Sequence, residues 1–118
     1  MEYKCPECGI RLVLQVQSVI VLPADDRDDE VSLQLVECDH CDYQAVAVYR
    51  ENRRGSDEAW SFDGWAVPEG LRAELEAAIS SCPRPQDPRC GCAGHQKAVE
   101  TSKKISAGPY ETFRMDPD

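Results

Sequence analysis

Two short cysteine motifs decide how this chain folds, CPECG at residues 5–9 and CDHC at residues 38–41. Each motif holds two cysteines two residues apart, and a mostly apolar stretch separates the motifs. Two such pairs bring four thiolates within reach of one ion, and four sulfurs around Zn²⁺ make a common closed structural site. We therefore expect Cys5, Cys8, Cys38 and Cys41 to bind one zinc ion.

The residues between and after the motifs have the alternation of β-strands. Apolar side chains alternate with polar ones from Ile10 to Leu22, and again from Val31 to Leu35, with an acidic connection over Pro23–Glu30. A third alternating stretch runs from Tyr43 to Arg50. The pattern predicts an antiparallel sheet that delivers the two cysteine motifs to one end.

The order of motif, hairpin, motif and strand resembles a zinc ribbon over about residues 3–50. Gly9, directly after the first pair, fits the tight turn of that family, whereas Asp42 stands where a glycine often follows the second pair. The resemblance implies a structural zinc ion but no single function, because ribbons serve in transcription factors, ribosomal proteins, enzymes and adaptors. A weaker resemblance to rubredoxin implies an iron ion and electron transfer as the alternative.

The residues that follow predict one more strand and a helix. The turn-forming stretch ENRRGSD at 51–57 precedes Trp60, Phe62 and Trp65, which predict a short strand whose aromatic rings fill the core or, alternatively, anchor a partner. Pro68, Glu69 and Gly70 then open a helix. Its apolar stripe, which we expect to pack on the sheet, consists of Leu71, Leu75, Ala78 and Ile79.

A second cysteine cluster follows this helix. Cys82, Cys90 and Cys92 lie close to His95, and a helix from Ala93 to about Lys104 would place Cys92 and His95 on one face. Three sulfurs and one imidazole would complete a second tetrahedral zinc site. The alternatives are a redox-active pair, for which Arg89 and Lys97 supply nearby cations, and thiols without a metal. His40 is predicted to be an exposed loop residue, because four sulfurs already close the first site.

Composition points to a small domain that needs a metal. The chain has 118 residues, of which 42% are hydrophobic and 7% aromatic, and lean domains of this size often rely on metals or disulfides. Seven cysteines and no signal-peptide pattern favour a reducing cytoplasm, where such pairs bind metals. The longest apolar run is too short to span a membrane.

Charge disfavours a nucleic-acid partner. The net charge is −9, and residues 1–50 carry four basic and ten acidic side chains. Only the C-terminal third is slightly basic, with Lys97, Lys103, Lys104 and Arg114. Affinity for nucleic acid depends on clustered cations facing phosphates, so another protein is the expected partner and nucleic acid is the alternative.

The sequence as a whole predicts an α+β protein that is not an enzyme. No Ser/His/Asp set, phosphate-binding glycine loop or H-E-x-x-H motif is present. We expect a zinc-ribbon-like β domain over 1–68, a helix with a packed Cys3His segment over 69–105, and a tail over 106–118. The predicted function is that of a cytoplasmic structural zinc-binding protein that acts as an interaction or adaptor module.

Overall fold

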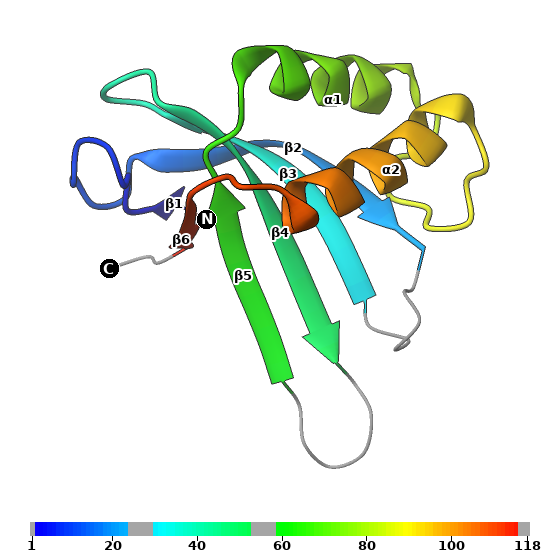
Figure 1. Ribbon diagram of the computed structural model, residues 1–118, viewed down its shortest axis with the longest axis horizontal. Helices are drawn as coiled ribbons and strands as arrows, with labels where there is room; N and C mark the ends of the chain where they lie inside the picture. Colours follow the sequence, from blue (N-terminus) through cyan, green and yellow to red (C-terminus); the bar gives the residue numbers. More distant parts are fainter. Residues whose placement is uncertain (1, 24–29, 53–58, 116–118) are drawn as a thin grey trace.

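The alternating stretches form a six-stranded sheet in the computed structural model, which describes residues 2–23, 30–52 and 59–115. The strands follow one another in the sheet in chain order, and every neighbouring pair is antiparallel. They are β1 (Glu2–Tyr3), β2 (Leu14–Leu22), β3 (Glu30–Cys38), β4 (Gln44–Asn52), β5 (Ala59–Trp65) and β6 (Thr112–Arg114). Two helices complete the predicted α+β fold, which is confirmed (Figure 1).

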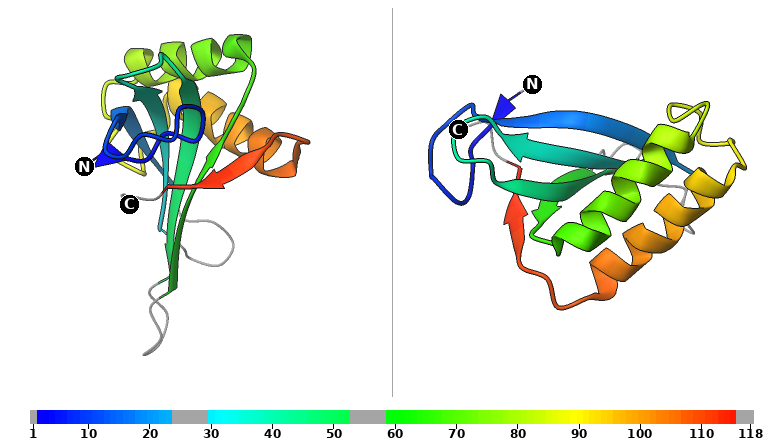
Figure 2. Two further views of the ribbon diagram at one scale, coloured as in Figure 1. Left: turned by 90° about the vertical axis from the view of Figure 1, so that its left-hand side faces the viewer. Right: turned by 90° about the horizontal axis from the view of Figure 1, so that it is seen from above.

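Both helices cover the same face of the sheet. They are α1 (Glu69–Ser81) and α2 (Ala93–Ala107), which lie side by side in each view (Figures 1 and 2). Their starts agree with the sequence prediction, and α2 ends three residues beyond Lys104. The buried core between helices and sheet contains Ile20, Leu33, Leu35, Val46, Leu75, Ile79, Ala98 and Ile105. The predicted packing of the α1 stripe on the sheet is therefore confirmed.

The first long strand begins later than its pattern predicts, at Leu14 and not at Ile10. The Cys5 N–H donates to the carbonyl of Ile10, and Leu12 has a positive φ of 60°, so the chain turns here and does not extend. Ile10 and Leu12 are 39% and 54% exposed. Alternation alone could not locate this turn, because it depends on main-chain bonds within the first cysteine motif.

The aromatic residues of β5 divide between core and surface. Phe62 is buried and packs edge-on against Tyr3 and Tyr49. Trp65 is half-buried against the core below the helices, whereas Trp60 is 68% exposed and stacks on Tyr49. The core role predicted for these rings holds for two of the three.

Within the segment 106–118, which the sequence predicts to be a tail, the described residues that follow α2 return to the sheet. Residues Thr112–Arg114 form β6 beside β5, and buried Met115 donates its N–H to the carbonyl of Phe62. The ring of Phe113 occupies the space that a side chain at Gly64 would need. A three-residue strand shows no periodicity, so only the packing reveals it. Residues 116–118 lie outside the described part.

The predicted turns are only partly described. Of the connection at 23–30 and the turn at 51–57, residues 24–29 and 53–57 lie outside the described residues. Glu30 already belongs to β3, and Glu51 and Asn52 still belong to β4. β3 and β4 are thus longer than the alternation of apolar and polar residues indicates.

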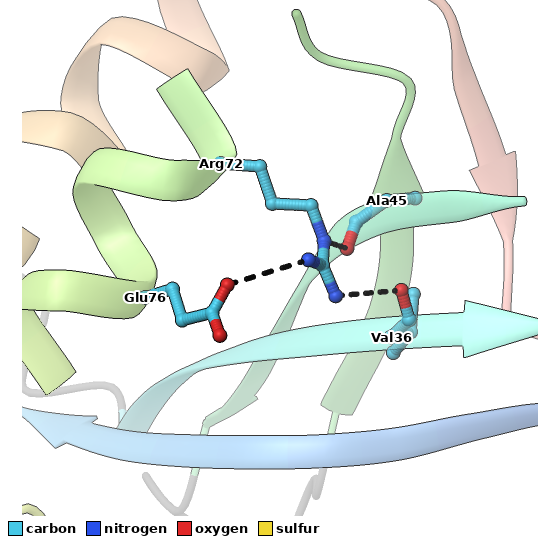
Figure 3. Close-up of polar contacts among 4 residues, drawn as sticks. All are labelled: Val36, Ala45, Arg72 and Glu76. Carbon is cyan, nitrogen blue, oxygen red and sulfur yellow. Dashed lines mark hydrogen bonds and ion pairs between the residues drawn. The ribbon is translucent and has the colours of Figure 1, made fainter. Parts of the chain in front are cut away.

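A buried arginine joins the start of α1 to the sheet. Arg72 is 7% exposed, and its guanidinium donates to the carbonyls of Val36 at 3.3 Å and Ala45 at 3.4 Å (Figure 3). Glu76 lies 3.9 Å from Arg72 Nη1, one helical turn further on. The two carbonyls belong to β3 and β4, so Arg72 fixes the helix over the part of the sheet that leads to Cys38.

None of the described helices is long and apolar enough to cross a membrane. The predicted cytoplasmic location stays a prediction.

Candidate metal centres

Two turns at one end of the sheet bring the first four cysteines together. One turn lies between β1 and β2, and the other joins β3 to β4. Gly9 has a φ of 73° and donates its N–H to the Cys5 carbonyl at 2.9 Å. Asp42 takes the same left-handed conformation, with a φ of 61°. Aspartate tolerates this region better than most residues do, so Asp42 can serve where a glycine often stands.

The spacing of the sulfurs fits a metal ion and not a disulfide. The Cys5 and Cys41 sulfurs are 3.6 Å apart, and those of Cys8 and Cys38 are 3.8 Å apart. Four sulfurs placed tetrahedrally about 2.3 Å from one ion lie about 3.8 Å from each other, whereas bonded sulfurs lie about 2.05 Å apart. All four ligand atoms lie within 4.8 Å of one another. The predicted residues therefore form a zinc-ribbon-like group that could hold a metal ion.

Main-chain N–H groups point at the sulfurs of this group. His40 and Cys41 both donate to Cys38 Sγ at 3.3 Å. Burial opposes ionisation of Cys38, but these two bonds, together with the contacts of its sulfur with Cys41 and Cys5, lower the pKa of that thiol. Burial raises the pKa of Cys5 and takes that of Cys41 to about 12. Within this group, the pKa of Cys38 is thus lowered, whereas the pKa values of Cys5 and Cys41 are raised.

The second group lies where the two helices meet. Cys82 caps the end of α1, Cys92 caps the start of α2, and His95 lies in the first turn of α2. The Cys82 sulfur is 3.7 Å from the sulfur of Cys90 and 3.1 Å from His95 Nδ1. The ligand atoms of these four residues again lie within 4.8 Å of one another. The structure therefore brings together all eight predicted ligands, as two separate groups.

A hydrogen bond to the sheet orients the histidine. His95 is 1% exposed, and its Nε2 lies 2.7 Å from the carbonyl of Val21. A carbonyl accepts only, so Nε2 carries a proton and donates to it, which leaves Nδ1 as the ring nitrogen that faces the Cys82 sulfur. Metal-binding histidines usually have such a partner on the other ring nitrogen. The Val21 N–H in turn donates to the carbonyl of Pro85 at 2.7 Å, which ties the loop before Cys90 to β2.

The pKa values of two thiols in the second group are shifted in opposite directions. The His95 N–H donates to Cys92 Sγ at 3.3 Å, and this bond lowers the pKa of Cys92 to about 7. Burial raises the pKa of Cys82 to about 11. The start of α2 adds a partial positive charge beside Cys92. Each group thus contains a thiol whose pKa is lowered by main-chain hydrogen bonds, Cys38 in the first and Cys92 in the second.

The structure adds contacts that the sequence could not supply. His40 is exposed and belongs to neither group, as predicted. The carbonyl of Val21 and the loop carbonyl of Pro85 take part in holding the second group, although no side-chain pattern marks them. Gly94 allows α2 to approach α1 closely, because a Cβ there would clash with the carbonyl of Ala78 and approach Ser81 Oγ to 2.9 Å.

Comparison of the chain with protein-family models, with characterised proteins and with solved structures finds no match. The two ligand groups therefore carry the functional argument.

Proposed function

We propose that this chain is a structural zinc-binding protein that holds two zinc ions and serves as a protein-interaction or adaptor module. The spacing of the ligand atoms carries the proposal. Two sulfur pairs in the first group and one in the second are 3.6–3.8 Å apart, close to the separation in a tetrahedral zinc site and well beyond that of a disulfide.

The choice of zinc rests on the donors of the second group. Three thiolates and one imidazole are a common ligand set of structural zinc. The first group, with four thiolates, is also compatible with the iron of a rubredoxin-like electron carrier, because both metals accept tetrahedral sulfur ligands. The similar design of the two groups favours the same metal in both.

A structural role for both ions follows from the number of donors. Each group offers four protein ligands, and a four-coordinate zinc ion has no position left for water or substrate. Catalytic zinc sites keep such a position open. The proposal that the chain is not an enzyme therefore rests on two closed ligand sets.

Exposed apolar side chains support the interaction role. Trp60 is 68% and Leu12 54% exposed, and Leu12 also has a costly positive φ. Both residues are held by regular structure nearby, Trp60 by β5 and Leu12 by the main-chain bonds of the first cysteine motif. Tryptophan is enriched among the residues that dominate protein–protein binding energy, which favours Trp60 as a contact residue.

The proposal is tested by the metal content of protein purified without added metal. Elemental analysis and an absorption spectrum should give about two zinc ions per chain and no colour. One zinc ion per chain would leave the second group as free thiols. A red protein with one iron ion would replace the structural role of the first group with electron transfer.

The interaction role needs a separate experiment. Affinity capture from cells of the source with the wild-type chain and with Trp60→Ser should show protein partners that the variant loses. Leu12→Ser is the parallel variant at the other exposed apolar side chain. Capture of nucleic acid in place of protein, with a steep dependence on salt, would favour the alternative partner class.

A further inference from the structure

The two ligand groups lie in surroundings of opposite charge. The segment that carries the second group, residues 82–97, contains Arg84, Arg89 and Lys97 against Asp87, and Lys97 Nζ lies 3.9 Å from the Glu74 carboxylate of α1. The segments that carry the first group, 4–11 and 37–42, contain two basic and four acidic side chains. A shallow pocket beside the first group is lined by Glu37, Asp39 and Asp42. Thiolates react most readily where the surroundings are positive and partly open to solvent.

The second group is also less firmly held. Each group contains two buried and two half-buried ligands, so the difference between them lies in the backbone that carries the sulfurs. The loop that carries Cys90 is held near that residue by short turn bonds, such as Cys90 N–H to the Asp87 carbonyl. In the first group, Cys38 is the last residue of a central strand and its Sγ accepts two main-chain N–H groups, whereas in the second group Cys92 Sγ accepts one, from His95. Hydrogen bonds to a thiolate lower its reactivity by drawing charge from the sulfur.

We propose that the second group is a peroxide-sensitive zinc latch that releases its ion when Cys82 and Cys90 form a disulfide. This inference rests on the proposed function, since it requires zinc in both groups. The two sulfurs are 3.7 Å apart, so a small movement of the loop suffices to join them.

The chemistry balances with hydrogen peroxide as the oxidant. The Cys90 thiolate attacks one peroxide oxygen, the O–O bond breaks, and a sulfenic acid and a hydroxide form. The Cys82 thiolate then attacks the Cys90 sulfur and displaces a second hydroxide. Two thiolates have lost two electrons in total to the peroxide, and two protons from the buffer convert the two hydroxides to water. Zinc keeps only Cys92 and His95 as ligands and leaves.

Loss of the ion would loosen the helices from the sheet. Zinc in this group joins the end of α1 to the start of α2, and His95 joins both to β2 through the Val21 carbonyl. Without it, the start of α2 keeps only its packing on α1 and the sheet. The first group, at the other end of the strands, is unaffected.

The test adds stoichiometric hydrogen peroxide to the protein after its zinc content has been measured as two ions per chain. A zinc-sensitive dye should report rapid release of one ion and retention of the other. Peptide mapping should find the Cys82–Cys90 disulfide, and hydrogen exchange should increase over 83–98. Dithiothreitol followed by zinc should restore the starting state.

Matched variants test the role of charge. Arg84→Gln with Arg89→Gln should slow release, whereas Lys103→Gln with Lys104→Gln, which removes the same charge near the far end of α2, should leave the rate unchanged. Equal release from both groups, a disulfide that excludes Cys82 or Cys90, or no release would overturn the latch while leaving the two-zinc proposal intact. A starting content below two ions would instead refute the proposed function.

Discussion

The two metal groups solve the same coordination problem with different structures. The first is built from two tight turns that continue directly into strands, and its sulfurs receive main-chain hydrogen bonds within those turns. The second is built from a helix end, a proline-rich loop and a helix start, and it depends on a distant strand to orient its histidine. The comparison indicates that the first group is part of the sheet, whereas the second fastens the helices to it.

The largest effect is expected from removing a ligand of the first group. Cys38→Ser should leave the sheet unfolded, because structural zinc in zinc-finger peptides contributes about 10–16 kcal/mol at neutral pH while whole domains are stable by only about 5–15 kcal/mol. Cys5→Ala should unfold the sheet for the same reason. Circular dichroism and native mass spectrometry measure the loss of fold and of zinc.

His40→Ala is the matched control, because His40 lies within the same turn but is exposed and outside the ligand group. It should keep both zinc ions. A Cys5→Ala protein that stays folded and retains two ions would contradict the role assigned to the first group.

Removing the histidine of the second group should have a smaller and more local effect. His95→Ala loses both the Nδ1 ligand and the bond to the Val21 carbonyl. The protein should keep one zinc ion and its sheet, with faster hydrogen exchange in α2. If the sheet unfolds as well, the two groups are not independent and the comparison fails.

The approach of the two helices can be tested apart from the metal. Gly94→Ala places a Cβ against the Ala78 carbonyl and should cost about 1–3 kcal/mol of unfolding free energy, as overpacked sites do. Gly70→Ala is the control, since a Cβ there meets nothing within 4 Å. It should stabilise the chain by up to about 1 kcal/mol. Equal effects in chemical denaturation would show that α2 does not depend on this close contact.

Arg72 provides a second attachment of α1, at the end of the helix opposite Cys82. Arg72→Met leaves the Val36 and Ala45 carbonyls without their donor and should lower the unfolding free energy by about 1–3 kcal/mol. Glu76→Gln removes only an exposed ion-pair partner of Arg72. This variant should change the unfolding free energy by less than about 0.5 kcal/mol. Both variants should retain two zinc ions. Loss of zinc from Arg72→Met would mean that the second group depends on this attachment.

Sequence patterns identified the parts of the molecule that depend on local spacing. The C-x-x-C pairs, the apolar stripe of α1, and the three-residue interval between Cys92 and His95 each follow from the geometry of a turn or a helix. The eight candidate ligands could be chosen on that basis, and the structure brings them together in the predicted groups.

Features that depend on main-chain hydrogen bonds or on contacts between distant segments could not be predicted from side-chain patterns. The turn at Leu12 is fixed by hydrogen bonds within the first motif, and β6 forms because Phe113 covers Gly64. The partner of His95 is the main-chain carbonyl of Val21 in β2, and any other residue at this position would supply the same carbonyl. Side-chain patterns carry no information about such contacts.

The central claim, two separate metal sites with different ligand sets, is tested most directly by ¹¹³Cd NMR of the cadmium-substituted protein. We expect two resonances, one from four-sulfur coordination and one from three sulfurs and a nitrogen. The second alone should disappear in His95→Ala. A single resonance in the wild type, or two that both disappear in the variant, would contradict the account.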